Sequence, residues 1–210
     1  MTIIVDYGIG NVFSVKRSLE QCGDTQARLS SDPEEIQNAD RIILPGVGAF
    51  RDGMQGLIDR DLIEPILNSI KQGKPFLGIC LGMQMLVSTS QEFGETSGLD
   101  LIPGKVIPIL ENSDNKLIKI PYIGWAKLNI TKKAKHQTSV LKNFSQNSYV
   151  YLVHSYHVQT KSNNDTIATY DYDGISVTAA IEKDNVIGFQ FHPEKSGEVG
   201  LEIINKFLSL

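Results

Sequence analysis

Cysteine is scarce in this sequence, with Cys22 and Cys80 as its two examples among 210 residues. Two cysteines are too few for the disulfide framework of a small secreted domain. Residues 1–6 contain no basic segment and no cleavage site, so we interpret them as a first strand rather than a signal peptide. We therefore expect free thiols and a cytoplasmic location.

Long hydrophobic runs and an excess of positive charge are also missing. No apolar run approaches the roughly 18 residues that a membrane-spanning helix needs, so we expect no membrane association. The formal net charge is −4 and the sequence has no dense Lys/Arg cluster, so nothing indicates nucleic-acid binding. A hydrophobic fraction of 41% is ordinary for a globular protein. The length predicts one α/β domain over residues 1–210, without room for a second full catalytic domain.

Short apolar runs alternate with amphipathic segments in the first hundred residues. We predict a strand at residues 3–5, a helix over 12–22, and a second strand and helix within 25–38. A third strand follows at residues 41–44, and helical segments extend to about residue 72. Such repeated units predict an α/β fold with a doubly wound, mostly parallel central sheet flanked by helices. Its functional loops would lie at the carboxyl ends of the strands.

The pattern changes after about residue 100. Short strand-like runs are separated there by turns rich in Asn, Asp, Gly and Lys, which predicts a smaller antiparallel or mixed β portion in the second half. A final helix is predicted over about residues 199–208. The runs predicted as strands are residues 105–109, 117–120, 127–130, 149–153, 167–170, 177–181 and 186–190.

The most informative motif is Gly-Ile-Cys-Leu-Gly at residues 78–82. An apolar run precedes it at residues 75–77, and residues 83–87 are predicted to form a helix. A strand, a tight turn with a nucleophile at its apex and a helix make a nucleophile elbow, here with cysteine in place of serine. The helix would direct its N-terminal amides toward the Cys80 sulfur, which favours the thiolate. The motif alone is weakly specific, so a buried structural cysteine is the alternative.

A thiol nucleophile needs a base, and His192 is the candidate. Residues i and i+2 of an extended segment project to the same side, so His192 and Glu194 can lie together with Pro193 between them. The imidazole would accept the thiol proton and later protonate a leaving amine, while the carboxylate holds the imidazole tautomer. An isolated His-Pro-Glu is usually only a loop. Here it follows a strand in a chain that also has the elbow, which indicates catalysis.

Attack of a thiol on a carbonyl creates an oxyanion, which preorganised amides must stabilise. One candidate donor is the amide of Leu81, directly after the nucleophile. The other is Pro-Gly-Val-Gly at residues 45–48, at the end of a neighbouring strand, where the amides of Val47 and Gly48 can face a ligand. An ordinary strand-to-helix turn is the alternative for this second segment.

Residues 78–84 and the His-Pro-Glu of residues 192–194 together resemble the signature of the triad, or class I, glutamine amidotransferases. Those domains hydrolyse the side-chain amide of glutamine through a cysteinyl thioester and release ammonia. Further motifs resemble the glutaminase subunit of imidazole glycerol phosphate synthase, from about residue 2 to the C-terminus. They are Asp-Tyr-Gly-Ile-Gly-Asn at 6–11, Leu-Pro-Gly-Val-Gly-Ala-Phe at 44–50, Leu-Ile-Pro-Gly-Lys-Val at 101–106, Gly-Trp at 124–125, Val-His-Ser-Tyr at 153–156 and His-Pro-Glu-Lys-Ser at 192–196.

The resemblance implies roles for individual residues. It implies a catalytic triad of Cys80, His192 and Glu194, and an oxyanion hole at Val47, Gly48 and Leu81. It implies glutamine contacts at Gly48, Gln84, Glu92, Ser155 and Tyr156. Without the resemblance, Gln84 would be interpreted as an exposed helical residue. No cofactor is needed for this chemistry, and no metal site is expected, because the spacing of His154 and His157 on a strand sends them to opposite faces.

A partner protein is also implied. The sequence has no Gly-x-x-x-x-Gly-Lys-Ser/Thr loop or other nucleotide-binding segment, so another polypeptide must use the ammonia. In the resembled family this partner is a (β/α)8 cyclase, bound as a heterodimer, which forms imidazole glycerol phosphate and AICAR in histidine biosynthesis. Ligand on the cyclase activates the glutaminase. Asn11, Trp125, Tyr151 and Lys195 match positions near that interface. The alternatives are core packing for Trp125 and a solvated charge for Lys195.

Residues 121–126 depart from the family pattern. They read Pro-Tyr-Ile-Gly-Trp-Ala, where the family usually has Pro-His-Met-Gly-Trp-Asn. This stretch lies near the expected partner surface, so a second partner stays open. In that alternative, the chain is a paralogous glutaminase subunit that supplies ammonia for nucleotide-sugar amidation in surface-polysaccharide synthesis. A cysteine peptidase or γ-glutamyl hydrolase on a similar scaffold is a remoter alternative.

Overall fold

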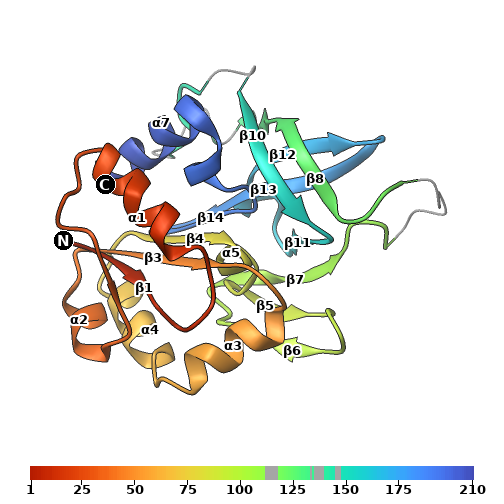
Figure 1. The fold of residues 1–210 in the computed structure, drawn as a ribbon. Coiled ribbons are helices and arrows are strands. Elements are labelled where there is room, and N and C mark those ends of the chain that lie inside the picture. The colour runs from red at the N-terminus through yellow and green to blue at the C-terminus, as the bar shows by residue number, and fades with distance from the viewer. Residues whose placement is uncertain (112–117, 133, 135–139, 145–147) are drawn as a thin grey trace.

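The structure is a computed structural model that describes residues 1–111, 118–132, 134, 140–144 and 148–210. Within these residues the centre of the fold is an eight-stranded sheet (Figure 1). The first five strands in spatial order are parallel, and the last three extend the sheet by antiparallel pairing. The order is β2 (Arg28–Ser30), β1 (Thr2–Val5), β3 (Arg41–Gly46), β4 (Phe76–Cys80), β14 (Val186–Phe189), β13 (Ile175–Lys183), β12 (Thr166–Tyr172) and β9 (Asn129–Ile130). The predicted α/β class with its mostly parallel central sheet is confirmed.

Helices cover both faces of the parallel strands, because those strands are apolar on both faces. Ile4 and Leu77 share a hydrophobic cluster with one layer of helices, whereas Ile3 and Phe76 share a second cluster with the other layer. Figure 1 shows the two layers above and below the sheet. The first layer comprises α1 (Val12–Gln21) and α7 (Gly197–Leu208), and the second comprises α2 (Pro33–Asn38), α3 (Phe50–Ile58) and α4 (Ile63–Lys71).

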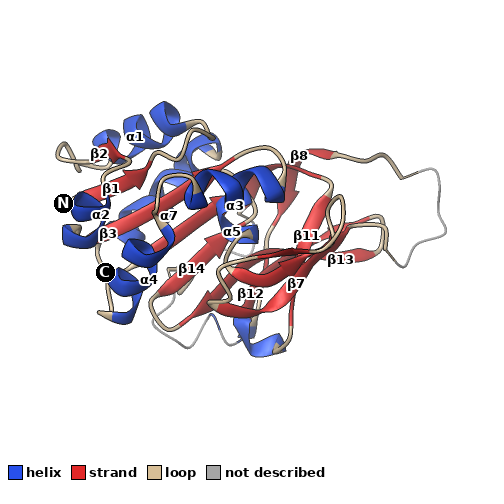
Figure 2. Ribbon diagram, turned by 90° about the horizontal axis from the view of Figure 1, so that it is seen from below, coloured by secondary structure: helices blue, strands red, loops and turns tan. Residues whose placement is uncertain are grey.

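Two smaller sheets form the predicted antiparallel or mixed portion, and Figure 2 shows these strands gathered on the side away from the N-terminus. One pairs β8 (Tyr122–Lys127) with β10 (Tyr149–His154). The other has the order β11 (Tyr156–Thr160), β7 (Ile102–Pro108), β5 (Val87–Ser90), β6 (Thr96–Ser97). The described residues also contain three short helical turns, α5 (Leu81–Gln84), η1 (Asn163–Asp165) and η2 (Pro193–Lys195). No helix of these residues is long and apolar enough to cross a membrane.

The predicted helix over residues 83–87 is wrong in its extent. Helix α5 ends at Gln84, and the chain enters strand β5 at Val87. The carbonyl of Met85 accepts a hydrogen bond from the amide of Leu99, and that of Leu86 accepts from the amide of Leu101. These long-range bonds replace the helical ones, so pairing with a distant segment overrides the local helical pattern.

Two predicted strands are also wrong. Leu117 lies outside the described residues, and residues 118–120 form no strand. The predicted strand at 127–130 divides between two sheets, because β8 ends at Lys127 and pairs with β10, whereas β9 pairs with β12. The sequence pattern marks an extended segment here and does not show where it changes partner.

Candidate active site

The elbow places Cys80 at the carboxyl end of β4, between two parallel neighbours. Cys80 has φ 55° and ψ −108°, a strained left-handed conformation that is typical of a nucleophile elbow. The flanking glycines are required by close backbone packing. A Cβ on Gly78 would lie 2.6 Å from the carbonyl oxygen of Gly82, and a Cβ on Gly82 would lie 1.8 Å from that of Leu44.

Sheet register brings His192 and Glu194 to the same sheet edge as Cys80. Strand β14 runs parallel to β4 with Phe189 opposite Ile79, so the residues after both strands emerge together. Nδ1 of His192 lies 2.8 Å from Oε1 of Glu194, and their side chains are 2% and 1% exposed. The buried pair matches the spacing predicted from His-Pro-Glu.

The charge state of His192 follows from its neighbours. Burial lowers the pKa of His192, but its interactions with Cys80 and Glu194 outweigh burial and raise that pKa from 6.5 to about 9. The imidazole is therefore mostly protonated at neutral pH. Its Nε2 atom is buried and has no hydrogen-bond partner among the described residues, which leaves it available to a group that enters beside the sulfur.

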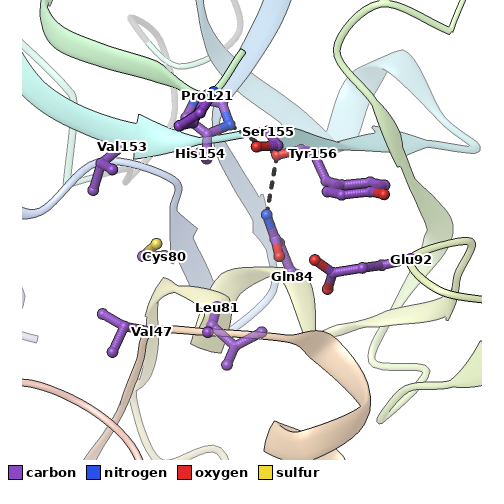
Figure 3. Close-up of a pocket in the computed structure, with 11 residues that line it drawn as sticks. Val47, Cys80, Leu81, Gln84, Glu92, Pro121, Val153, His154, Ser155 and Tyr156 are labelled. Atoms are coloured by element: carbon purple, nitrogen blue, oxygen red, sulfur yellow. Dashed lines mark hydrogen bonds between the residues drawn. The ribbon is translucent and has the colours of Figure 1, made fainter.

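A pocket of about 270 Å³ opens at the Cys80 sulfur (Figure 3). It brings together all the residues expected to contact glutamine or stabilise an oxyanion, namely Val47, Gly48, Leu81, Gln84, Glu92, Ser155 and Tyr156. Figure 3 shows Val47 and Leu81 on one side of the sulfur, and Val153 and His154 on the other. Pro121, Val153 and His154 also line the pocket and were not expected there, although each lies in a quoted motif.

Gln84 and Glu92 give the pocket its polar wall. Gln84 is 6% exposed, and its Nε2 donates to the Tyr156 carbonyl at 3.1 Å, which excludes the alternative interpretation as an exposed helical residue. Oε2 of Glu92 accepts the backbone amide of Phe50 at 2.7 Å, at the first residue of α3. The wall therefore combines an anion with amide groups, which suits a small ligand carrying an ammonium group.

Tyr7 is a functional candidate that the sequence analysis did not identify. Its hydroxyl donates to the Pro45 carbonyl at 2.7 Å, two residues before Val47. Burial and the nearby charge of Cys80 both raise the pKa of Tyr7 well above its usual value, so it stays a neutral donor. Gly48 has φ 103°, a conformation that favours glycine, and both Val47 and Gly48 are exposed at the pocket. Tyr7 thus fixes the start of this loop.

His154 and His157 lie in two strands, β10 and β11, and not in one strand as expected. Nδ1 of His154 lies 2.8 Å from the Tyr156 carbonyl, and its Nε2 lies 2.8 Å from the Tyr170 hydroxyl. Nδ1 of His157 accepts the amide of Thr178. Burial lowers the pKa of each histidine to about 4, so both are neutral parts of the fold.

Three of the four expected interface residues lie together: Trp125 and Tyr151 pair across β8 and β10, and Lys195 of η2 lies beside them. Trp125 is 53% exposed, which excludes core packing, and its ring lies 6.1 Å from that of Tyr151 on the paired strand. Nζ of Lys195 lies 5.9 Å above the Tyr151 ring, so Lys195 is more than a solvated charge. Asn11 precedes α1, where its Oδ1 accepts the Ser14 hydroxyl.

Comparison with known proteins covers the whole chain. The family model described as glutamine amidotransferase class-I matches residues 3–209. The imidazole glycerol phosphate synthase subunit HisH 1 of Legionella pneumophila (strain Paris) is 51% identical over 209 residues, which are 99% of this chain and 98% of that protein. The HisH subunit of Wolinella succinogenes is 43% identical over 210 residues, covering 100% of both chains.

Solved structures of lower sequence identity share the fold. PurLQS from Thermotoga maritima has a TM-score of 0.69 at 19% identity, over 99% of this chain and 97% of that one. A crystal structure described as a glutamine amidotransferase has a TM-score of 0.70 at 14% identity, over 99% of this chain and 97% of that one.

Proposed function

Because this chain belongs to the class-I glutamine amidotransferase family, we propose that it is the glutaminase subunit of an imidazole glycerol phosphate synthase. It hydrolyses L-glutamine to glutamate and ammonia, which serves histidine biosynthesis. The observation that carries the proposal is a strained Cys80 beside the buried His192–Glu194 pair, at a pocket with an anionic and amide wall. Relatives that match nearly the full chain at 43–51% identity support the subfamily.

The chemistry follows from the placement of the triad. The Cys80 thiolate attacks the carboxamide carbon of glutamine, and a C–S bond forms as the carbonyl oxygen becomes an oxyanion. The His192 imidazolium donates its Nε2 proton to the carboxamide nitrogen and the C–N bond breaks. Ammonia is released, and a thioester remains on Cys80. Neutral His192 then accepts a proton from water as the water oxygen bonds to the thioester carbon. The C–S bond breaks, glutamate leaves, and the Cys80 thiolate and His192 imidazolium are restored.

The pocket residues have separate tasks in this proposal. The amides of Leu81, Val47 and Gly48 stabilise the oxyanion, with the loop anchored by Tyr7. Glu92 attracts the α-ammonium group of glutamine, because it is the carboxylate that lines the pocket among the described residues. Gln84, Ser155 and Tyr156 offer amide, hydroxyl and backbone groups to the rest of the substrate.

Substrate class is tested directly by assaying free glutamine against a panel of peptides and γ-glutamyl compounds. We expect ammonia release from free glutamine and no cleavage of the panel, because the pocket of about 270 Å³ suits a small ligand. Peptide cleavage in place of glutamine hydrolysis would identify a peptidase or γ-glutamyl hydrolase and contradict the proposal.

The pH profile tests the Glu194–His192 pair. Because the pKa of His192 is raised to about 9, the imidazolium that protonates the leaving nitrogen persists up to that pH, and hydrolysis should decline above it. Glu194→Gln removes a charge that favours the imidazolium, so the alkaline limb should move down by about one pH unit or more. The measurement is the pH dependence of kcat/KM for glutamine. An alkaline limb at the same pH in both proteins would show that Glu194 does not set the charge of His192.

We propose that the partner is a (β/α)8 cyclase, bound as a heterodimer at the face that carries Trp125, Tyr151 and Lys195. The departure at Tyr122 does not argue against it, because this half-buried side chain packs against the core of the chain itself. Its ring lies 5.0 Å from that of Tyr170 and 4.7 Å from that of Tyr172. Ile123 and Trp125 are the large apolar side chains that β8 exposes, at 63% and 53%.

We expect slow glutamine hydrolysis by the chain alone, and about 10²-fold stimulation by the cyclase with its ligand. The reason is that partner binding would turn a backbone amide of residues 45–48 toward the oxyanion, and one such donor is worth about that factor. The measurement is ammonia release with and without the partner recovered by pull-down from the native cells. A recovered cyclase that converts the histidine-pathway intermediate supports the proposal. A nucleotide-sugar amidating partner would assign the chain to the paralogous role, and full activity of the lone chain would contradict partner activation.

A further inference from the structure

Gln190 is a buried polar side chain without a role in the mechanism above. It follows strand β14 and is 0% exposed. Its Nε2 lies 3.8 Å from the Cys80 sulfur, and its Oε1 accepts Nε2 of Gln84 at 3.1 Å. One buried amide therefore contacts both the nucleophile and a residue of the pocket wall.

The direction of these hydrogen bonds is set by the Tyr156 carbonyl, which can only accept. Gln84 must present its NH₂ group there, at 3.1 Å, and that group also donates to Gln190. The carbonyl oxygen of Gln190 is thereby turned toward Gln84, and its NH₂ group toward the Cys80 sulfur. The Gln84 NH₂ group therefore donates both to Tyr156 and to Gln190, and the branch through Gln190 ends with a donor at the Cys80 sulfur.

We propose that Gln190 is a positioning residue for Cys80, an inference that rests on the proposed function of this site. Its N–H group stabilises the thiolate, which accepts hydrogen bonds better than the neutral thiol does. Through Gln84 it also holds the sulfur at a defined place relative to Tyr156, on the wall of the glutamine pocket. A side chain that only packed in the core would not need an amide at residue 190. An apolar side chain there would remove the contacts with Cys80 and Gln84.

The experiment compares Gln190→Leu with a matched control, Asn185→Leu. The Asn185 side-chain amide also makes partly buried hydrogen bonds, to the carbonyls of Ile70 and Lys74, but it lies at the opposite end of β14. Iodoacetamide labelling of Cys80 at pH 7 reports the sulfur without requiring glutamine, and Cys22→Ala in every protein makes the signal specific. We expect labelling about tenfold slower in Gln190→Leu, to the same final extent, and an unchanged rate in Asn185→Leu.

A second variant keeps the result decisive if Gln190→Leu does not fold. Gln190→Glu preserves the shape and the acceptor for Gln84, but its ionised form has no donor for the sulfur, so it should slow labelling at least as much. With glutamine, both variants should lower kcat by about tenfold with little change in KM. Wild-type labelling rates in a folded variant would overturn the role of Gln190. Wild-type protein that labels well and does not hydrolyse glutamine would contradict the proposed function instead.

Discussion

Replacing Cys80 with alanine is expected to lower glutamine hydrolysis by at least about 10⁴-fold, because no thioester can then form. Among the described residues, Cys80 is the thiol at the pocket; Cys22 lies in the helix layer, where its sulfur donates to the Leu201 carbonyl. The measurement is ammonia release under saturating glutamine, with the partner present. Cys22→Ala is the matched control and should keep full activity.

The fold and partner binding should survive the Cys80→Ala change. Alanine tolerates φ 55° no worse than cysteine does, and the change removes a single sulfur atom from a residue that lines the pocket. Circular dichroism and partner pull-down check both points. Undiminished ammonia release by a folded Cys80→Ala protein would remove the thiol from the mechanism, and with it the assignment of the triad.

Much of this site can be predicted from the sequence because its key elements are local. The glycines around Cys80 and the two-residue spacing of His192 and Glu194 specify geometry within a few neighbouring residues. The parallel pairing of β14 with β4 then brings the two strand ends together, and the sequence does not predict this pairing, because its pattern places residues 186–190 in the antiparallel or mixed portion.

The parts that could not be predicted depend on contacts between distant segments. Tyr7 meets Pro45 across 38 residues, and Gln84 meets Gln190 across 106 residues. Neither tyrosine nor glutamine has a spacing that signals such a contact, since both are common on surfaces. The short α5 has the same origin, because the carbonyls after Gln84 are taken by the segment near Leu99.

Gly82 also packs against a segment that is distant in sequence. Of the substitutions considered, its replacement should lower stability most. Gly82→Ala is expected to lower the free energy of unfolding by more than about 4 kcal/mol, or to prevent folding. The added Cβ would lie 1.8 Å from the Leu44 carbonyl oxygen, which belongs to the buried strand β3 and cannot move alone. The measurement is the urea midpoint, or the yield of protease-resistant protein if none can be purified.

Gly53→Ala in α3 is the matched control for this clash. Its Cβ would lie 2.7 Å from the Met85 sulfur, the flexible end of a side chain that can shift. The gain in helix propensity, about 1 kcal/mol, offsets that shift, so stability should change little. Equal urea midpoints for the two variants would show that the elbow accommodates a side chain at residue 82. The Gly-x-Cys-x-Gly pattern would then need an explanation in substrate access. The expected difference would instead make Gly82 a condition for packing α5 against β3 closely enough to form the elbow at Cys80.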